Sequence, residues 1–153
     1  MYHHVVEVTP TLDTSAYGSG DHLGTLMTLT GALPSQGGGA RLEKITIVDK
    51  AKQSAAINVL LFTASPTLTS VDNAALDISD SEMGDKCIGK IAVAAADYVA
   101  LNANSVAAVC PGTNGFPVKG AAGSTTLYAM LQSAGTPTYA ASSLVVKFHF
   151  TWD

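Results

Sequence analysis

The sequence predicts an all-β protein, and the best single prediction is a jelly-roll β-sandwich of about eight antiparallel strands. Short segments alternate apolar and polar residues with a period of two, and loops rich in glycine, proline and small polar residues separate them. The loops vary widely in length, which favours a Greek-key arrangement over a simple meander. An immunoglobulin-like sandwich is the alternative, weakened because the chain lacks the Cys…Trp…Cys arrangement of that fold.

Residues 42–66 form the stretch around which the chain is organised, and their pattern predicts a β-hairpin. In the first arm Ile45 and Ile47 point to one side, while Thr46 and Val48 point to the other. The second arm, residues 57–62, is apolar on both sides. Such a strand must be covered on both faces, either inside a two-layer sandwich or by a neighbouring subunit.

Further strands are expected at residues 5–12, 24–30, 87–94, 105–110, 124–132 and 144–152. Pro10 cannot donate to a ladder, so the first of them is an edge strand or ends there. The last has the cleanest alternation, with five large apolar side chains on one face: Leu144, Val146, Phe148, Phe150 and Trp152. A brief helical turn is expected near residues 95–101, because Asn102 and Asn104 oppose a longer helix.

Three long segments between the strands are expected to be loops. Residues 31–40 hold a run of three glycines, which suggests a mobile loop, because no helix follows to complete a phosphate-binding motif. Residues 67–86 are acidic and are expected to cross the sandwich in solvent, with a helical turn at residues 74–78. The spacing of their acids does not match a calcium loop. Residues 111–123 are expected to be loop, anchored by Phe116 and Val118.

Length and composition indicate one domain, residues 1–153, in which residues 1–5 can extend as an N-terminal arm. Hydrophobic residues make up 47% of the chain and charged residues only 13%, which is typical of a protein that works within an assembly. The net charge of −4 is concentrated in the five acids of residues 72–85. No basic face is predicted, so nucleic acid is not an expected partner. No apolar run is long enough for a membrane span.

The residues give little support for catalysis. His22, His149 and Glu43 are the only candidates for a metal cluster, and none of the common catalytic motifs is present. We therefore expect no enzyme activity, no catalytic residues, no metal and no cofactor. The cysteines, Cys87 and Cys110, are expected to be two half-buried free thiols, with a disulfide between them as the alternative. Tyr17, Tyr98 and Tyr139 fall on loops and leave a carbohydrate site open as an alternative.

Several stretches, taken in order, resemble a family of small proteins found beside the major capsid protein in tailed bacteriophages. The stretches are residues 17–24 (YGSGDHLG), 45–62 (ITIVDKAKQSAAINVLLF), 95–98 (AADY), 104–107 (NSVA), 125–128 (TTLY) and 135–139 (GTPTY). The resemblance covers roughly residues 17–139 and is lost mainly at the acidic loop and the two ends. No single stretch is specific, and the likeness rests on the ordered set.

The resemblance implies a capsid cement, or decoration, protein with a jelly-roll fold and no catalytic residues. Such a protein is made in the host cytoplasm and binds the outer capsid surface of the virion. Its implied partners are the major capsid protein and further copies of itself, as a homodimer or homotrimer. The competing hypothesis is a receptor- or carbohydrate-binding module of a phage tail fibre or spike.

Contacts with the capsid are expected from loops and from the N-terminal arm. The residues predicted for this interface are Met1, Tyr2, His3, His4, Gly37, Gly38, Gly39, Phe116 and Pro117. The triple glycine is expected to become ordered on binding.

Overall fold

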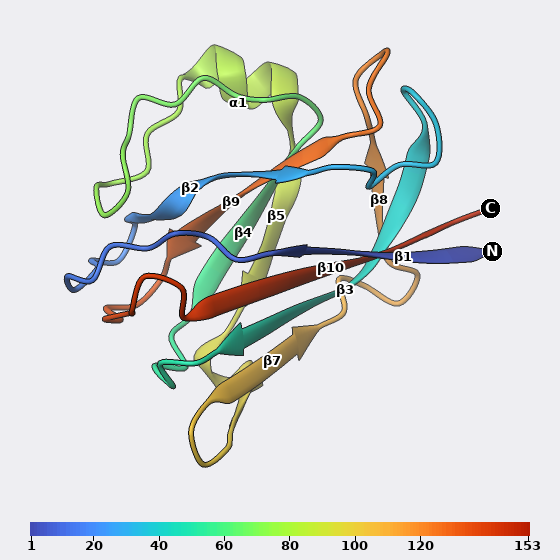
Figure 1. Ribbon diagram of the computed structural model, residues 1–153. Coiled ribbons are helices and arrows are strands. Elements are labelled where there is room, and N and C mark those ends of the chain that lie inside the picture. Colours follow the sequence, from blue (N-terminus) through green and yellow to red (C-terminus); the bar gives the residue numbers. More distant parts are fainter.

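The computed structural model describes residues 1–153 as two packed antiparallel sheets (Figure 1). The six-stranded sheet has the order β1-β10-β3-β7-β6, with β8 paired to β3 as well, and the four-stranded sheet has the order β2-β9-β4-β5. The strands are β1 (Tyr2–Val8), β2 (His22–Leu29), β3 (Gly39–Asp49), β4 (Ile57–Phe62), β5 (Cys87–Val93), β6 (Tyr98–Ala100), β7 (Ser105–Val109), β8 (Phe116–Lys119), β9 (Leu127–Ser133) and β10 (Leu144–Trp152). Two short helical segments, α1 (Asp80–Lys86) and the 3-10 turn η1 (Ala95–Asp97), complete the chain.

The strand order is that of a jelly roll. When the short strands β6 and β8 are set aside and the other eight are renumbered along the chain, the two sheets read 1-8-3-6 and 2-7-4-5. This is the pattern that two nested Greek keys produce. The predicted jelly-roll sandwich is therefore confirmed.

The core lies between the two sheets and follows from the alternation of each strand. Phe148 and Phe150 of β10 and Ile45 and Ile47 of β3 are fully or almost fully buried, and they face Ile57, Val59 and Leu61 of β4. Burial of each such side chain contributes about 1.5–3 kcal/mol. We call the opposite side of the six-stranded sheet, which points away from this core, its outer face.

The prediction of a hairpin at residues 42–66 is wrong, because its two arms lie in different sheets. β3 pairs with β10, β7 and β8, whereas β4 pairs with β9 and β5. The connection between them crosses from one sheet to the other. Asp49, which is fully buried, fixes the beginning of this connection. Its carboxylate accepts hydrogen bonds from the backbone N–H groups of Ala51 at 2.9 Å and Ser54 at 2.8 Å.

The second apolar side of β4 is covered by the chain itself. Residues 63–86, here called the excursion, leave β4 after Phe62 and reach the far edge of the four-stranded sheet beside β2. There the N–H of Asn73 donates to the carbonyl of His22 at 2.9 Å, and the N–H of His22 donates to Ala74 at 2.8 Å. The excursion thus passes over this sheet (Figure 1), which explains why Phe62 and Met130 are fully buried yet lie outside the main core.

Within the excursion the helical turn predicted at residues 74–78 is wrong, since Ala75 bridges to Asp21 and the helix lies further on, at α1. Ser79 caps α1 by accepting the N–H of Glu82, whose carboxylate pairs with Lys86 at 2.6 Å. Neither helical segment has the length and apolar character needed to span a membrane. Cys87 and Cys110 are free thiols, and Cys87 is half-buried as predicted, whereas Cys110 is exposed.

Candidate interaction surface

The predicted N-terminal arm is part of the sheet. β1 pairs with β10 along its whole length, with Tyr2 opposite Trp152 and His4 opposite Phe150. Residues 2–5 are therefore not a free arm, because their backbone groups are used in the ladder. Met1 and Tyr2 are nevertheless strongly exposed, at 82% and 68%, and the ring of His4 lies 5.5 Å from that of Trp152.

The triple glycine is held by main-chain hydrogen bonds. Gly37 donates to Ser124 at 2.8 Å, Gly38 donates to Ser35 at 2.9 Å, and Gly38 accepts from Gly120 at 3.0 Å. A Cβ atom at Gly38 would lie 2.7 Å from Oγ of Ser35. The same Cβ atom would lie 2.8 Å from the carbonyl oxygen of Ser35, so Gly38 permits a close approach of two backbone segments.

Phe116 and Pro117 belong to β8, where the sequence predicted loop. Phe116 is half-buried, and a Cβ atom placed on Gly89 of β5 would lie 2.7 Å from its Cζ atom. Its ring therefore packs against the other sheet and helps to close the sandwich. Pro117 is exposed and stands opposite Arg41 of β3.

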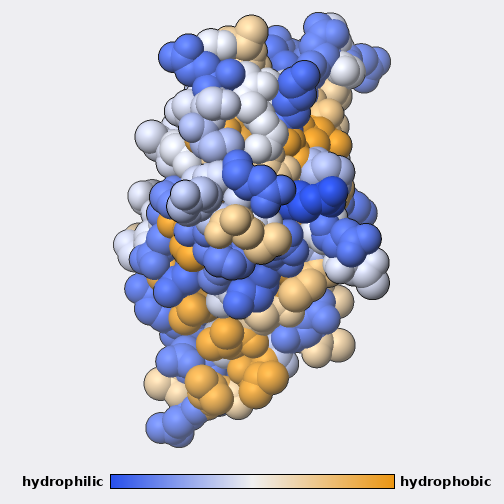
Figure 2. Space-filling view, turned by 90° about the vertical axis from the view of Figure 1, so that its right-hand side faces the viewer, coloured by the Kyte–Doolittle hydropathy of each residue, from blue (hydrophilic) through white to orange (hydrophobic).

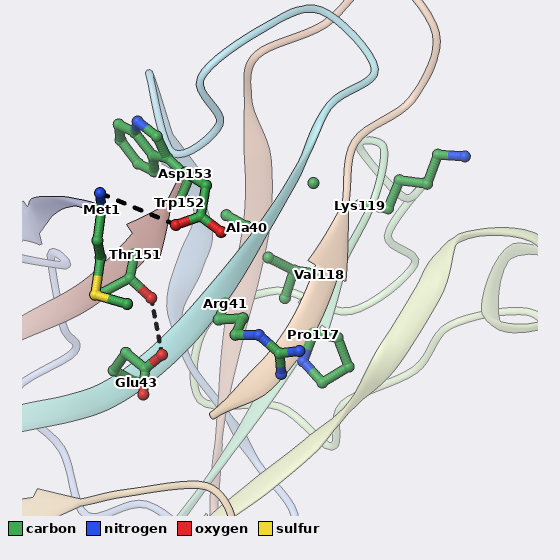
Figure 3. Close-up of a pocket in the computed structure, with 11 residues that line it drawn as sticks. Met1, Ala40, Arg41, Glu43, Pro117, Val118, Lys119, Thr151, Trp152 and Asp153 are labelled. Atoms are coloured by element: carbon green, nitrogen blue, oxygen red, sulfur yellow. Dashed lines mark hydrogen bonds and ion pairs between the residues drawn. The ribbon is translucent and has the colours of Figure 1, made fainter. Parts of the chain in front are cut away.

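A hollow of about 560 Å³ opens over residues 39–43 of β3, between the end of β10 and β8 (Figure 3). Met1, Gly39 and Pro117, one from each of the three predicted contact segments, lie along it. The other lining residues are Ala40, Arg41, Glu43, Val118, Lys119, Thr151, Trp152 and Asp153. The fold thus brings distant parts of the sequence to one end of the six-stranded sheet.

The hollow contains the only arginine of the chain and its only tryptophan. Arg41 is exposed and its Nη1 atom donates to the carbonyl oxygen of Asn114 at 2.8 Å. Glu43 occupies a β-bulge, the position skipped where the pairing of β3 with β10 shifts register. Its Oε1 atom accepts from the hydroxyl of Thr151 at 2.8 Å (Figure 3). Bulges commonly re-aim a side chain in this way.

A row of four valines crosses the other end of the outer face. Val145 of β10 is opposite Val48 of β3, Val48 is opposite Val106 of β7, and Val106 is opposite Val99 of β6. Val99 is 65% exposed, and Leu101, just beyond β6, is 52% exposed. Figure 2 shows hydrophobic residues gathered at the lower end of the molecule, where β7 lies in Figure 1. We call Val145, Val48, Val106 and Val99 the valine row.

The three tyrosines predicted to lie on loops do not form a platform for a sugar, and Tyr98 belongs to strand β6. Tyr17 and Tyr139 are only 2% exposed, and Tyr98 is half-buried with its hydroxyl inside the protein. Burial raises the pKa of all three hydroxyl groups. The interpretation of these residues as candidate sugar contacts is therefore wrong.

The three candidates for a metal cluster lie in different surroundings. His22 is on β2 of the four-stranded sheet and is buried, whereas His149 and Glu43 belong to the six-stranded sheet. Glu43 is bound to Thr151, and His149 lies 3.3 Å from the hydroxyl of Thr46. No group of three His, Cys, Asp or Glu side chains is close enough to hold a metal ion.

Sequence reasoning missed Arg41 and the valine row. The position of the only arginine two residues after a glycine run was a usable signal, because arginine and tryptophan are typical of binding hot spots. The valines were visible as apolar residues at strand positions where alternation calls for polar ones. Their alignment across four strands depends on register, which one sequence does not supply.

No protein-family model matches the chain, and no curated protein matches it in sequence. Among solved structures the chain is similar to one titled Desmodium yellow mottle tymovirus, at 12% sequence identity and a TM-score of 0.32. That likeness covers 97% of this chain and 83% of the other. The jelly-roll assignment rests on the strand order and is independent of this likeness.

Proposed function

We propose that this chain is a structural protein of a tailed-bacteriophage virion, a cement protein that binds the outside of the capsid and stabilises the lattice of the major capsid protein. The observation that carries the proposal is the meeting of three predicted contact segments around the hollow over β3. The hollow combines an exposed methionine, an arginine and a tryptophan, which are residue types enriched at protein interfaces. The ordered resemblance to phage cement proteins adds independent support.

The second partner in this proposal is another copy of the chain, bound through β6. This strand lies at the edge of the six-stranded sheet, and neither it nor β7 carries a charged residue. Edge strands of monomers are usually protected by charges, proline, bulges or shortness, and of these β6 has only its short length of three residues. Two copies of β6 paired antiparallel about a two-fold axis would place Val99 opposite Val99 and join the two valine rows.

Cement works through many weak contacts. A dimer that touches two capsid subunits gains avidity, because the second contact forms at a high effective concentration once the first has formed. Bridged subunits then resist separation under pressure from the packaged genome. The hollow and the valine row lie at opposite ends of the outer face, which leaves both free to be used at once.

The alternative, a receptor- or carbohydrate-binding module of a tail fibre or spike, relied on the loop tyrosines. Their burial removes that support. The receptor- or carbohydrate-binding module remains one possible outcome of the capsid-binding experiment described below.

Mixing the purified protein with capsids that lack it, followed by cosedimentation and densitometry, tests the proposal. We expect saturable binding at a fixed ratio to the major capsid protein, together with greater resistance of the capsids to heat and osmotic shock. No binding to capsids, with retention on host cells or glycans, would overturn the proposal in favour of the receptor module.

A further inference from the structure

We propose that the hollow over β3 receives an extended segment of the capsid protein that carries an acidic residue beside apolar ones, and that Arg41 and Lys119 bind its carboxylate. This inference rests on the proposed function and specifies the chemistry of the partner. Four observations on the hollow support it: its unpaired charges, the relative position of the two bases, its floor and its lining.

The two acids of the hollow each have a polar contact within the chain, and neither of its bases has an ion-pair partner. Glu43 accepts from the hydroxyl of Thr151 at 2.8 Å, and the carboxylate of Asp153 lies 4.0 Å from the amino nitrogen of Met1. Arg41 and Lys119 make no ion pair within the chain. The bond from the Thr151 hydroxyl leaves the charge of Glu43 in place, so what the hollow offers a partner is two exposed bases without an ion pair, and not a net positive charge. A carboxylate complements these two bases.

Both bases can reach one carboxylate. Gly39 is opposite Lys119 and Arg41 is opposite Pro117, so Arg41 and Lys119 are diagonal neighbours on adjacent strands. Long side chains in this relation are within reach of each other. Their charged ends point apart in Figure 3, but both side chains are exposed and can turn toward one carboxylate. The Nη1 contact with Asn114 fixes the plane of the guanidinium and leaves its other N–H groups free. A planar group with several donors suits a bidentate contact with a carboxylate.

The floor of the hollow at Gly39 leaves room for a partner. Gly39 has extended backbone, and a Cβ atom there would lie 3.4 Å from the carbonyl oxygen of Val118, an ordinary contact. A larger residue at this position would therefore fill the hollow without straining the strand. This provides a way to block the site that leaves the two charges in place.

The lining favours a protein segment over a free anion. Besides the two bases, the hollow presents the exposed Met1 and Pro117 and the partly buried Trp152. A small anion would leave these surfaces unused, whereas a peptide with apolar residues beside its acid would cover them. The partner is thus defined by a combination of charge and apolar surface.

The experiment measures cosedimentation of purified variants with capsids that lack the protein, at several salt concentrations. Arg41→Gln, Lys119→Gln and Gly39→Val should each weaken binding by about tenfold or more, since charge-assisted contacts and steric exclusion both act here. Arg41→Lys should bind with intermediate affinity, because lysine keeps the charge but loses the bidentate geometry. Lys90→Gln is the matched control, an exposed lysine of β5 on the other sheet, and should bind like wild type.

Thermal unfolding of each variant verifies that the fold is kept. If Arg41→Gln, Lys119→Gln and Gly39→Val all bind like wild type, this inference is overturned while the cement function stands. If the wild-type protein itself does not bind capsids, the proposed function fails and this inference fails with it. The two failures are therefore distinguishable in one experiment.

Discussion

The hydroxyl group of Tyr17 donates a hydrogen bond of 2.8 Å to the carboxylate of Asp72, which lies in the excursion. The same carboxylate accepts the N–H groups of Asp13 and Gly24, each at 2.7 Å. Asp72 therefore fastens the excursion to β2 and to the connection that precedes it. With that fastening the excursion stays over the four-stranded sheet and keeps Phe62 and Met130 covered.

Asp72→Ala should lower the free energy of unfolding by about 2–4 kcal/mol, because it leaves the part-buried N–H of Gly24 and the hydroxyl of Tyr17 without an acceptor. The N–H of Asp13 keeps the Tyr17 oxygen as an acceptor, at 2.8 Å. Tyr17→Phe removes the hydrogen bond to Asp72 and the one that the Tyr17 oxygen accepts from the N–H of Asp13, which still donates to Asp72. It should lower the free energy of unfolding by about 1–2 kcal/mol. Urea denaturation measures both. The control is Asp85→Asn, an exposed acid of the same segment, expected to change stability by less than about 0.5 kcal/mol. An Asp72→Ala variant as stable as this control would show that the fastening contributes nothing.

Stability should also depend on the protonation of His22. Burial lowers the pKa of this imidazole below its usual value of 6.5, while the charge of Asp72 acts in the opposite direction. Both ring nitrogens are buried without a hydrogen-bond partner. At low pH the unfolded chain therefore binds a proton at His22 more readily than the folded chain does. The free energy of unfolding should be highest above about pH 6.5 and should fall as the pH decreases below that value.

Urea denaturation between about pH 5 and 8 tests this dependence, and His22→Gln should flatten it. His149 contributes with the same sign, because burial and the nearby Lys44 and Lys147 lower its pKa. The effect of His149→Gln therefore measures how much of the pH dependence of stability comes from His149. A His22→Gln protein with the wild-type pH dependence would contradict the assignment.

Much of the fold could be predicted from alternation alone. β10 was expected at residues 144–152 and is found at Leu144–Trp152, because each of its inward positions carries a large apolar side chain. The expected strand at residues 105–110 is β7. Alternation identifies the face of a strand that is buried, but it does not say which sheet the strand joins. For this reason the pattern of β3 and β4 suggested a hairpin although a seven-residue connection carries the chain across the sandwich.

Local signals of two missed elements were present. Ser79 followed by Glu82 is the pattern of a helix cap, and Glu82 with Lys86 is a stabilising pair one turn apart. These residues were assigned to the solvated loop because their segment is acidic. β8 was hidden by Pro117 and the flanking glycines, and its strand forms through pairing with β3, a contact between residues far apart in sequence.

The contact segments were predicted in part for the wrong reason. Mobility was expected of residues 1–5 and of the triple glycine, yet the former are in β1 and the latter is hydrogen-bonded. What brings Met1, Gly39 and Pro117 together is the pairing of β3 with both β10 and β8. The pattern of residues within one strand does not reveal which other strands pair with it, so this arrangement could not be predicted from the sequence.

Contact between Phe116 and Gly89 should be detectable as a coupling between the two positions. Gly89→Ala places a methyl group against the Phe116 ring, whose nearest atom would be 2.7 Å away, and should lower the free energy of unfolding by about 1–2 kcal/mol. In a Phe116→Ala background the added methyl group meets open space, so its effect should be much smaller. A double-mutant cycle by urea denaturation measures the difference. Equal effects of Gly89→Ala in both backgrounds would exclude direct packing.

Self-association through β6 should be abolished by a charge at Val99. Because Val99 is 65% exposed, Val99→Lys should leave the stability of the monomer within about 0.5 kcal/mol of wild type. In a two-fold pairing of β6 the two introduced lysines face each other, and like charges directly opposite on paired strands are destabilising. Sedimentation velocity over a range of concentrations should show association at least about tenfold weaker, equivalent to about 1.4 kcal/mol.

Val71→Lys is the matched control, since Val71 is 72% exposed but lies in the excursion, away from the six-stranded sheet. It should associate like wild type. If both variants weaken association equally, loss of general surface hydrophobicity explains the effect and the valine row has no special part in it. If Val99→Lys associates like wild type, the copies meet through another surface, and the antiparallel pairing of β6 is wrong.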